Sequence, residues 1–119
     1  VRIWSEAYSR RILQMITQTA HFTLGDIVRH QHKQYRGIVI DVDPEFDGPE
    51  QWYEANAERR PPREQPWYSL LVDDSEQVAY VAEENLETDD TDEPVSHPAM
   101  AGLIGEFQHG RYTVHQTLN

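Results

Sequence analysis

The stretch YRGIVIDVDPEF at residues 35–46 decides the fold class of this chain. Its apolar, β-branched centre predicts a strand over residues 35–43, the clearest strand in the sequence. Asp41, Asp43 and Glu45 occupy every second position and therefore share one face of an extended strand. Clustered carboxylates suit a hard cation or acid–base chemistry, but at the end of a strand they more often face water. A third option is that Asp41 and Asp43 brace the root of the insertion that follows by bonding its backbone amides.

Further short strands surround this one. Residues 22–30, FTLGDIVRH, alternate in hydropathy, and the loop QHKQ predicts a hairpin into the 35–43 strand. Residues 67–74 and 77–86 predict a second antiparallel hairpin. Between the two hairpins, residues 44–66 form a long connection with five prolines and a short helix near residues 49–60. The sequence therefore predicts a mainly β fold of about five antiparallel strands, as a small barrel or a partly open sheet.

The ends of the chain predict peripheral elements. Residues 1–20 repeat apolar side chains at helical spacing and predict an amphipathic helix, with a frayed extension as the alternative. Residues 96–107 predict a short helix with Ser96 or His97 as the N-cap and Pro98 in its first turn. The last ten residues predict an edge strand or a loose tail. The acidic run at residues 87–94 predicts a solvated connector.

Composition limits the function classes. A chain of 119 residues without cysteine fits one domain and excludes disulfides, thiolate metal sites and cysteine nucleophiles, as is typical of a reducing cytoplasm. No apolar run reaches the roughly 18 residues of a membrane span. The sequence contains no G-x-S-x-G, P-loop or G-x-G-x-x-G motif. We therefore expect no enzyme, no catalytic residues, no cofactor and no membrane partner.

The net charge of -11 is unevenly distributed. Residues 1–40 carry about +4 and the remainder about -15, so the body of the protein repels phosphate. DNA binding would therefore need a local basic face, and Arg29, Lys33 and Arg36 around the first hairpin are the candidate contacts. Ordinary surface charge that offsets nearby acids is the favoured alternative.

Histidines and aromatic residues are the remaining candidates for a site. His30 and His32 form an H-x-H pair, but no third ligand is identifiable, so a surface pair is favoured and no metal is expected. Trp52, Tyr53 and Trp67 are candidate anchors for a protein partner, because large aromatic side chains dominate interface energies. Packing against the sheet is the default for the first two, and Trp67 or its neighbour belongs in the core. The other histidines lack a spacing signature: His21, His97, His109 and His115.

Several segments together resemble the HspQ family, also called YccV-like or hemimethylated-DNA-binding proteins. The similarity is carried by FTLGDIVRH, YRGIVIDVDPEF, QPWYSLLVDD, AYVAEENL and EPVSHP, in this order and with the long insertion. It places the family domain at residues 15–112, with an N-terminal extension at residues 1–14 and a tail at residues 113–119. Family members begin near position 15, so we expect residues 1–14 to be dispensable.

The resemblance implies a fold and a function. It implies a small SH3-like β-barrel with the long insertion between its second and third strands. It also implies a cytoplasmic heat-shock protein that promotes degradation of denatured proteins, as a specificity factor for the Lon protease. Lon and denatured client proteins are then the expected partners, with hemimethylated DNA as the alternative and self-association left open. The family has no catalytic motif to transfer to this chain.

Overall fold

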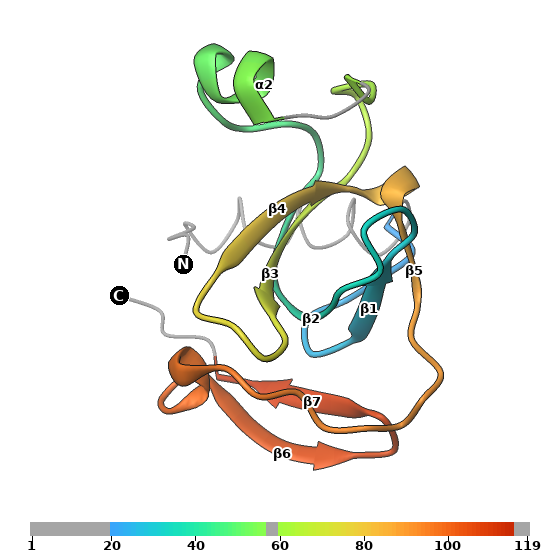
Figure 1. Ribbon diagram of the computed structural model, residues 1–119, viewed down its shortest axis with the longest axis vertical. Helices are drawn as coiled ribbons and strands as arrows, with labels where there is room; N and C mark the ends of the chain where they lie inside the picture. The colour runs from blue at the N-terminus through green and yellow to red at the C-terminus, as the bar shows by residue number, and fades with distance from the viewer. Residues whose placement is uncertain (1–19, 57–59, 116–119) are drawn as a thin grey trace, which may run out of the picture.

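The computed structural model describes residues 20–56 and 60–115. The helix expected at residues 1–20 and the extension at residues 1–14 lie outside these residues, apart from position 20. Five strands form one antiparallel sheet, and two more form a separate hairpin (Figure 1). The strands of the main sheet are β1 (Ile27–His30), β2 (Arg36–Asp43), β3 (Trp67–Val72), β4 (Val78–Ala82) and β5 (Leu86–Thr88). The separate hairpin contains β6 (Ile104–Gln108) and β7 (Arg111–Val114).

Both hairpins expected from the sequence are confirmed. β1 pairs with β2 across the QHKQ loop, and β3 pairs with β4 across a turn at residues 73–77. The strand order is β4-β3-β2-β1-β5. In the described part of the chain β4 and β5 do not pair with each other, so the structure shows the antiparallel sheet while its closure into an SH3-like barrel stays a prediction.

Helical structure is sparse. The insertion at residues 44–66 contains α2 (Glu50–Asn56), as its sequence predicts, and Figure 1 shows this helix at the opposite end of the molecule from β6 and β7. Two 3₁₀ turns are described, η1 (Glu83–Asn85) and η2 (Pro98–Met100). None of the described helices is long and apolar enough to cross a membrane.

The prediction of a helix over residues 96–107 is wrong beyond the first turn of that helix. His97 does cap η2, because its ring accepts a hydrogen bond from the Ala99 N–H. The chain then turns at Gly102, whose φ is +88°, and continues as β6. Pairing with β7, which includes the register pair Phe107 and Tyr112, outweighs the weak helical preference of this glycine-containing segment. The edge-strand interpretation of the tail is confirmed at β7.

A β-bulge in β2 determines which side chains enter the core. Strict alternation would place Val39 on one face with Asp41 and Asp43. The register against β3 shifts between Val39 and Asp41, so Val42 returns to the cluster that contains Val39. Asp43 then pairs opposite Trp67, on the other face. The bulge thus keeps the carboxylates out of the main core while the strand continues.

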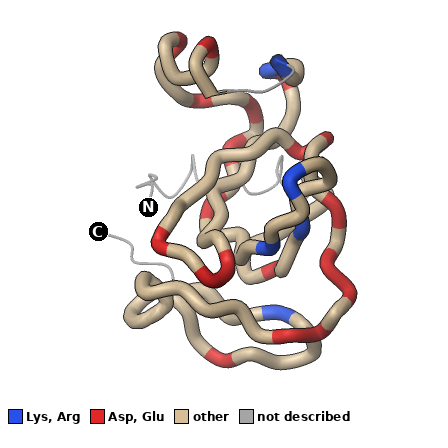
Figure 2. The backbone as a smooth tube through the Cα atoms, viewed as in Figure 1, with Lys and Arg blue, Asp and Glu red and all other residues tan. Residues whose placement is uncertain are grey.

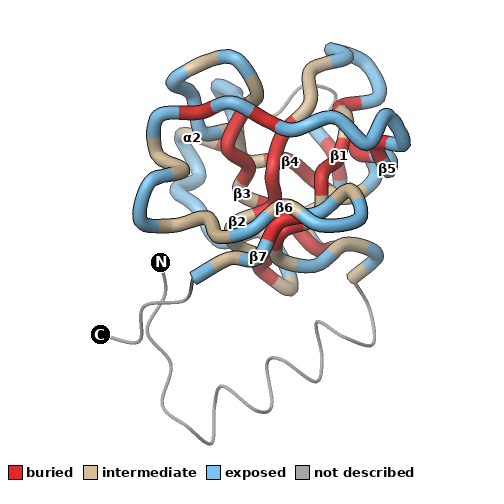
Figure 3. Tube along the Cα trace, turned by 90° about the horizontal axis from the view of Figure 1, so that it is seen from below, coloured by how far each residue is buried: buried red, intermediate tan, exposed pale blue. Residues whose placement is uncertain are grey.

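Apolar side chains pack on both faces of the sheet. One cluster draws residues from all five strands: Val28, Val39, Val42, Tyr68, Leu70, Val81 and Leu86. The opposite face is covered by the C-terminal segment, with Ile38 and Leu71 packed near Val95 and Tyr112. Figure 3 shows the buried positions concentrated on the strands and the exposed ones on the connections. A third cluster, beneath α2, belongs to the candidate site.

Gly25 joins the main sheet to the β6–β7 hairpin, and we expect Gly25→Ala to separate the two. Its φ is +91°, and an added Cβ would lie 1.8 Å from the Tyr112 carbonyl oxygen. The substitution is expected to lower the free energy of unfolding by about 2 kcal/mol, from strain and overpacking. Hydrogen exchange should report loss of the bond in which the Tyr112 N–H donates to the Gly25 carbonyl at 2.8 Å.

Gly102→Ala provides the matched control for this substitution. Gly102 has a similar φ of +88°, but an added Cβ would meet no atom within 4 Å. This variant therefore carries the backbone strain alone. Equal losses of stability in the two variants, with unchanged exchange at Tyr112, would contradict the role assigned to Gly25.

Candidate functional site

The basic residues of the first hairpin do not form an open cationic face. Arg29 on β1 contacts Asp89 at 2.8 Å, and Arg36 on β2 contacts the other Asp89 oxygen at 3.0 Å. Arg36 also pairs with Asp73 at 3.0 Å and donates to the backbone carbonyl of Glu93. The side chains of Arg29 and Arg36 are only 30% and 13% exposed. The favoured interpretation of these two residues, charge that offsets nearby acids, agrees with this geometry.

Asp89 corrects the expectation that residues 87–94 form a solvated connector. Its side chain is fully buried, and it also accepts a hydrogen bond from the Thr91 hydroxyl. Burial by itself would raise the pKa of Asp89, but the hydrogen bonds from Thr91, Arg29 and Arg36 outweigh it and hold the pKa below its usual range. The acidic segment is thus fastened to the sheet at this residue.

Lys33 and His32 lie at the surface in the β1–β2 turn, whereas His30, at the end of β1, is buried. His30 is 7% exposed, so the expectation of a surface histidine pair is wrong for this residue. Its Nδ1 accepts hydrogen bonds from the backbone N–H groups of His32 and Lys33, each at 3.1 Å. His30 therefore shapes the turn that presents Lys33. Among the described residues, no cluster of three or more His, Asp or Glu could hold a metal ion.

The three aligned carboxylates have separate environments. Glu45 is exposed, as expected for a strand end, whereas Asp43 is buried. The Tyr80 hydroxyl donates to Asp43 at 2.6 Å and accepts from the Asp47 N–H at 3.0 Å. Asp43 thus braces the start of the insertion through Tyr80. The bracing option is supported for Asp43, although through a tyrosine rather than through backbone amides, while Asp41 accepts from the Val42 N–H.

We expect Tyr80→Phe to loosen the start of the insertion. The variant removes the hydroxyl shared by Asp43 and Asp47. Losing a hydrogen bond to a buried carboxylate should lower the free energy of unfolding by about 1–3 kcal/mol. A double-mutant cycle with Asp43→Asn checks the pairing, because contacting residues show a coupling of at least about 0.5 kcal/mol. Strictly additive effects would contradict the bracing role.

Aromatic side chains join the insertion to the sheet. Phe46, Trp52 and Tyr53 come from the insertion, and Trp67 and Tyr80 come from β3 and β4. Ring centroids of neighbouring members lie 5.1–6.4 Å apart. Such pairs contribute beyond the area they bury. This aromatic cluster therefore holds α2 over one end of the sheet.

Two of the three aromatic candidates for partner contacts are internal. Tyr53 is 6% exposed and Trp67 is 1% exposed, whereas Trp52 is partly exposed. The Tyr53 hydroxyl donates to the Pro61 carbonyl at 2.8 Å, and the Arg63 guanidinium lies 4.1 Å from the Tyr53 ring centroid. In this conformation Tyr53 and Trp67 are occupied by packing, so Trp52 is the candidate that a partner can reach.

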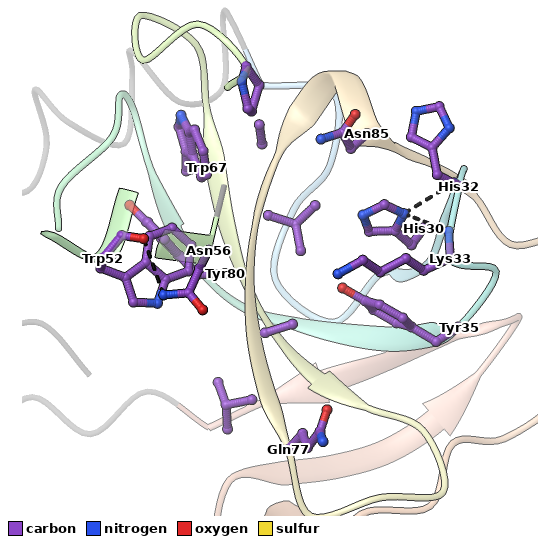
Figure 4. A pocket seen from close by; sticks show the side chains of 15 residues that line it. His30, His32, Lys33, Tyr35, Trp52, Asn56, Trp67, Gln77, Tyr80 and Asn85 are labelled. Atoms are coloured by element: carbon purple, nitrogen blue, oxygen red, sulfur yellow. Dashed lines mark hydrogen bonds between the residues drawn. The ribbon is translucent and has the colours of Figure 1, made fainter. Parts of the chain in front are cut away.

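A groove of about 390 Å³ lies along β4. Figure 4 shows Trp52, Trp67 and Tyr80 on one side of the β4 ribbon and the β1–β2 turn with Lys33 on the other. The lining of the groove therefore comes from both sides of β4, from the insertion on one side and from the first hairpin on the other. Trp67 also lines the groove, and its indole N–H is buried without a hydrogen-bond acceptor among the described residues.

A buried tyrosine holds the segment that follows β4. The Tyr68 hydroxyl donates to Glu83 at 2.6 Å, and the same carboxylate oxygen accepts from the His21 N–H at 2.8 Å. Burial, followed by the bond to Glu83, raises the pKa of Tyr68 well above its usual range. The hydroxyl therefore stays protonated at neutral pH and keeps donating. η1, which begins at Glu83, is held in place at the end of β4.

Sequence reasoning missed three residues that organise this region. Asp89 is hidden in an acidic run, and nothing local distinguishes it from its exposed neighbour Asp90. In the sequence, Tyr80 is simply one residue of a predicted strand. Its partner Asp43 is 37 residues away, so no local pattern indicates the contact. Phe46 gave a detectable signal, because an aromatic residue directly after a strand and a proline needs an apolar surface to cover it.

Comparison with protein families agrees with the resemblance noted from the sequence. The family model described as "Hemimethylated DNA-binding protein YccV like" matches residues 20–111. This range contains all five strands of the main sheet, the insertion, the groove and the ion pairs of Asp89. Because the match covers about three quarters of the sequence, the chain belongs to the YccV-like family.

Proposed function

We propose that this protein is a non-enzymatic, cytoplasmic binding module of the stress response. It binds denatured proteins and promotes their degradation, as a specificity factor for the Lon protease. The observation that carries the proposal is the groove along β4, which combines an end strand with aromatic side chains. Such a surface suits a polypeptide, because strand edges and aromatic pockets are both used in peptide recognition.

The charge distribution favours a protein partner over DNA. The net charge is -11, and Figure 2 shows acidic positions spread over most connections of the described chain. Arg29 and Arg36 are engaged by Asp89, so phosphate binding would have to compete with a buried carboxylate. A partner with basic surface meets no such competition.

A degradation assay tests the proposed function. Purified Lon and an unfolded substrate are incubated with ATP, with and without this protein, at a concentration where it is folded. The substrate should disappear faster when the protein is present, while a natively folded form of the same substrate should not. Parallel measurement of ATP hydrolysis separates substrate delivery from general activation of Lon. An unchanged rate for the unfolded substrate would count against the proposal.

Binding of hemimethylated DNA is the second candidate function. The description of the family model favours it, and Lys33 is exposed on the β1–β2 turn beside the partly exposed Arg29. Fluorescence anisotropy with hemimethylated, fully methylated and unmethylated duplexes across a salt series measures affinity and specificity together. A steep salt dependence is expected for phosphate contacts.

Lys33→Glu and Arg60→Glu form a matched pair for the DNA assay. Both reverse one charge at an exposed residue, but Arg60 lies in the insertion and pairs with Glu54. If the first hairpin contacts DNA, only Lys33→Glu should weaken binding and flatten the salt dependence. Arg29 and Arg36 are unsuitable for this test, because their replacement would also break the ion pairs with Asp89. Equal binding by both variants would contradict the basic-hairpin hypothesis.

A further inference from the structure

Arg29 and Arg36 lie directly opposite each other in the β1–β2 ladder. Side chains at opposite positions share one face of a sheet, and two like charges placed in this way repel each other. Asp89 relieves the repulsion, because one of its oxygens contacts the Nη2 of Arg29 and the other contacts the Nε of Arg36. Guanidinium groups bind phosphate in the same manner as carboxylate. The pair therefore has the chemistry of an oxyanion site, and the chain fills this site with its own carboxylate.

Asp89 does not satisfy every donor of this pair. Arg36 is engaged through each of its nitrogens, since its Nη1 also contacts Asp73 and its Nη2 donates to the Glu93 carbonyl. Arg29, by contrast, has a buried Nε–H without an acceptor among the described residues, although its side chain is 30% exposed. A buried donor without an acceptor is costly. A phosphate group presents more oxygens than a carboxylate, so it could accept a hydrogen bond from this N–H as well.

Residues 90–94 close the site without belonging to either sheet. The backbone carbonyls of Glu93 and Pro94 contact Arg36, but the segment forms no helix or strand and all of its side chains are exposed. Asp92 has a φ of +62°, a left-handed conformation that costs energy for a residue other than glycine. Displacing this segment would therefore break no strand pairing and would relieve this strain.

The same segment keeps external phosphate away from the arginines. Asp90, Asp92 and Glu93 are exposed, and Figure 2 shows acidic positions along the connection that follows β5. Their carboxylates repel an approaching phosphate, while the buried Asp89 holds the arginines. A ligand must therefore displace this segment before it reaches the pair. Such a requirement lowers the apparent affinity of a site in proportion to the fraction of molecules in which the site is open.

We propose that Arg29 and Arg36 form a phosphate-binding site, which Asp89 and residues 90–94 hold closed in this structure. The ligand is a phosphate group, either of a nucleic-acid backbone or free in solution. Binding exchanges the carboxylate of Asp89 for phosphate oxygens, and no covalent bond forms or breaks. The inference goes beyond the proposed function, because neither Lon nor the methylation of DNA enters it.

Asp89→Asn opens the site for a binding test with a labelled DNA duplex. The substitution removes the competing charge and keeps both arginines. Asp90→Asn makes the same change in net charge at an exposed neighbour and is the matched control. Fluorescence anisotropy should show several-fold tighter binding by Asp89→Asn than by Asp90→Asn or the unmodified protein. The slope of log K against log salt should also steepen by about 1 to 2, as expected for one or two added phosphate contacts.

Inorganic phosphate is the second probe. In thermal unfolding at equal ionic strength, phosphate should raise the Tm of Asp89→Asn above its value in chloride, because a ligand that binds only the folded state stabilises it. The increase should exceed that of Asp90→Asn, which reports the general effect of phosphate on a folded protein. Addition of Arg29→Gln to Asp89→Asn should abolish the gains with both probes.

Thr91→Val and Thr88→Val keep the test decisive if Asp89→Asn does not fold. Thr91→Val removes the hydroxyl that donates to Asp89 at 2.7 Å and so loosens the closed form without touching either arginine. Thr88 is an exposed residue of β5, and its replacement is the matched control. Thr91→Val should bind at least one probe more tightly than Thr88→Val.

Each outcome of these measurements supports or overturns the proposal. A gain with the duplex alone identifies a nucleic-acid backbone as the ligand, and a gain with inorganic phosphate alone identifies the free anion. No gain with either probe, or a gain that survives Arg29→Gln, would overturn the proposal. If neither probe binds more tightly but the protein still accelerates Lon-dependent degradation, this site is wrong and the proposed function stands.

Discussion

Replacement of Asp89 by asparagine is expected to lower the free energy of unfolding by about 3 kcal/mol. Asp89 is the buried acceptor for Arg29 and Arg36, with contacts of 2.8 and 3.0 Å. Removing one partner of a buried ion pair costs roughly 3–5 kcal/mol, because the other charge remains uncompensated. The lower value applies here because Arg29 is 30% exposed and therefore partly hydrated. Urea unfolding followed by tryptophan fluorescence measures the change.

The same carboxylate predicts a loss of stability in acid. The pKa of Asp89 is lower in the folded protein than its ordinary value of 3.8. A lowered pKa means that the unfolded chain binds the proton more tightly, so this contribution is complete above about pH 4 and declines as the pH falls through the folded pKa. The Asp89→Asn variant lacks this group, so its stability should fall less steeply as the pH drops below about 4.

Asp90→Asn is the matched control for both measurements. It makes the same chemical change one position away, at an exposed residue. A surface substitution of this kind should change stability by no more than about 0.5 kcal/mol. Equal effects of the two substitutions would show that residues 87–94 are a solvated connector after all. They would also restore Arg29 and Arg36 as candidates for phosphate binding.

Trp67→Ala is expected to have a similarly large effect, about 3–5 kcal/mol. Trp67 is 1% exposed and is the largest fully buried side chain of the described chain. Its ring contacts Phe46, Trp52 and Tyr80, so truncation leaves a cavity between the sheet and the insertion. Loss of a buried Trp combines the lost transfer energy with the cost of that cavity. Chemical denaturation followed by circular dichroism measures this loss.

The Trp67 variant should also loosen the insertion. Limited proteolysis should cut residues 44–66 faster in Trp67→Ala than in the unmodified protein. Trp67→Phe retains an aromatic ring and removes the indole N–H that lacks an acceptor among the described residues, so it should be milder in both assays. If the insertion is cut at the same rate in all three proteins, the aromatic cluster does not hold it.

Much of the sheet was predictable because its signals are local. The β-branched run of β2, the QHKQ turn and the β3–β4 hairpin each lie within a few adjacent residues. The helix in the insertion also follows from neighbouring residues. The prediction for residues 96–107 failed because its determinant is not local. β6 forms through its pairing with β7 rather than through the strand propensity of its own residues.

By itself, the amino-acid sequence determined the antiparallel hairpins, the long insertion and the membership of the YccV-like family. Tertiary structure decided which charges and aromatic residues can reach a partner. Asp89 meets Arg29 across 60 residues of sequence, and the bulge in β2 directs Asp43 toward Tyr80. Burial of a charge depends on what the distant chain places beside it. The composition around one residue does not contain that information.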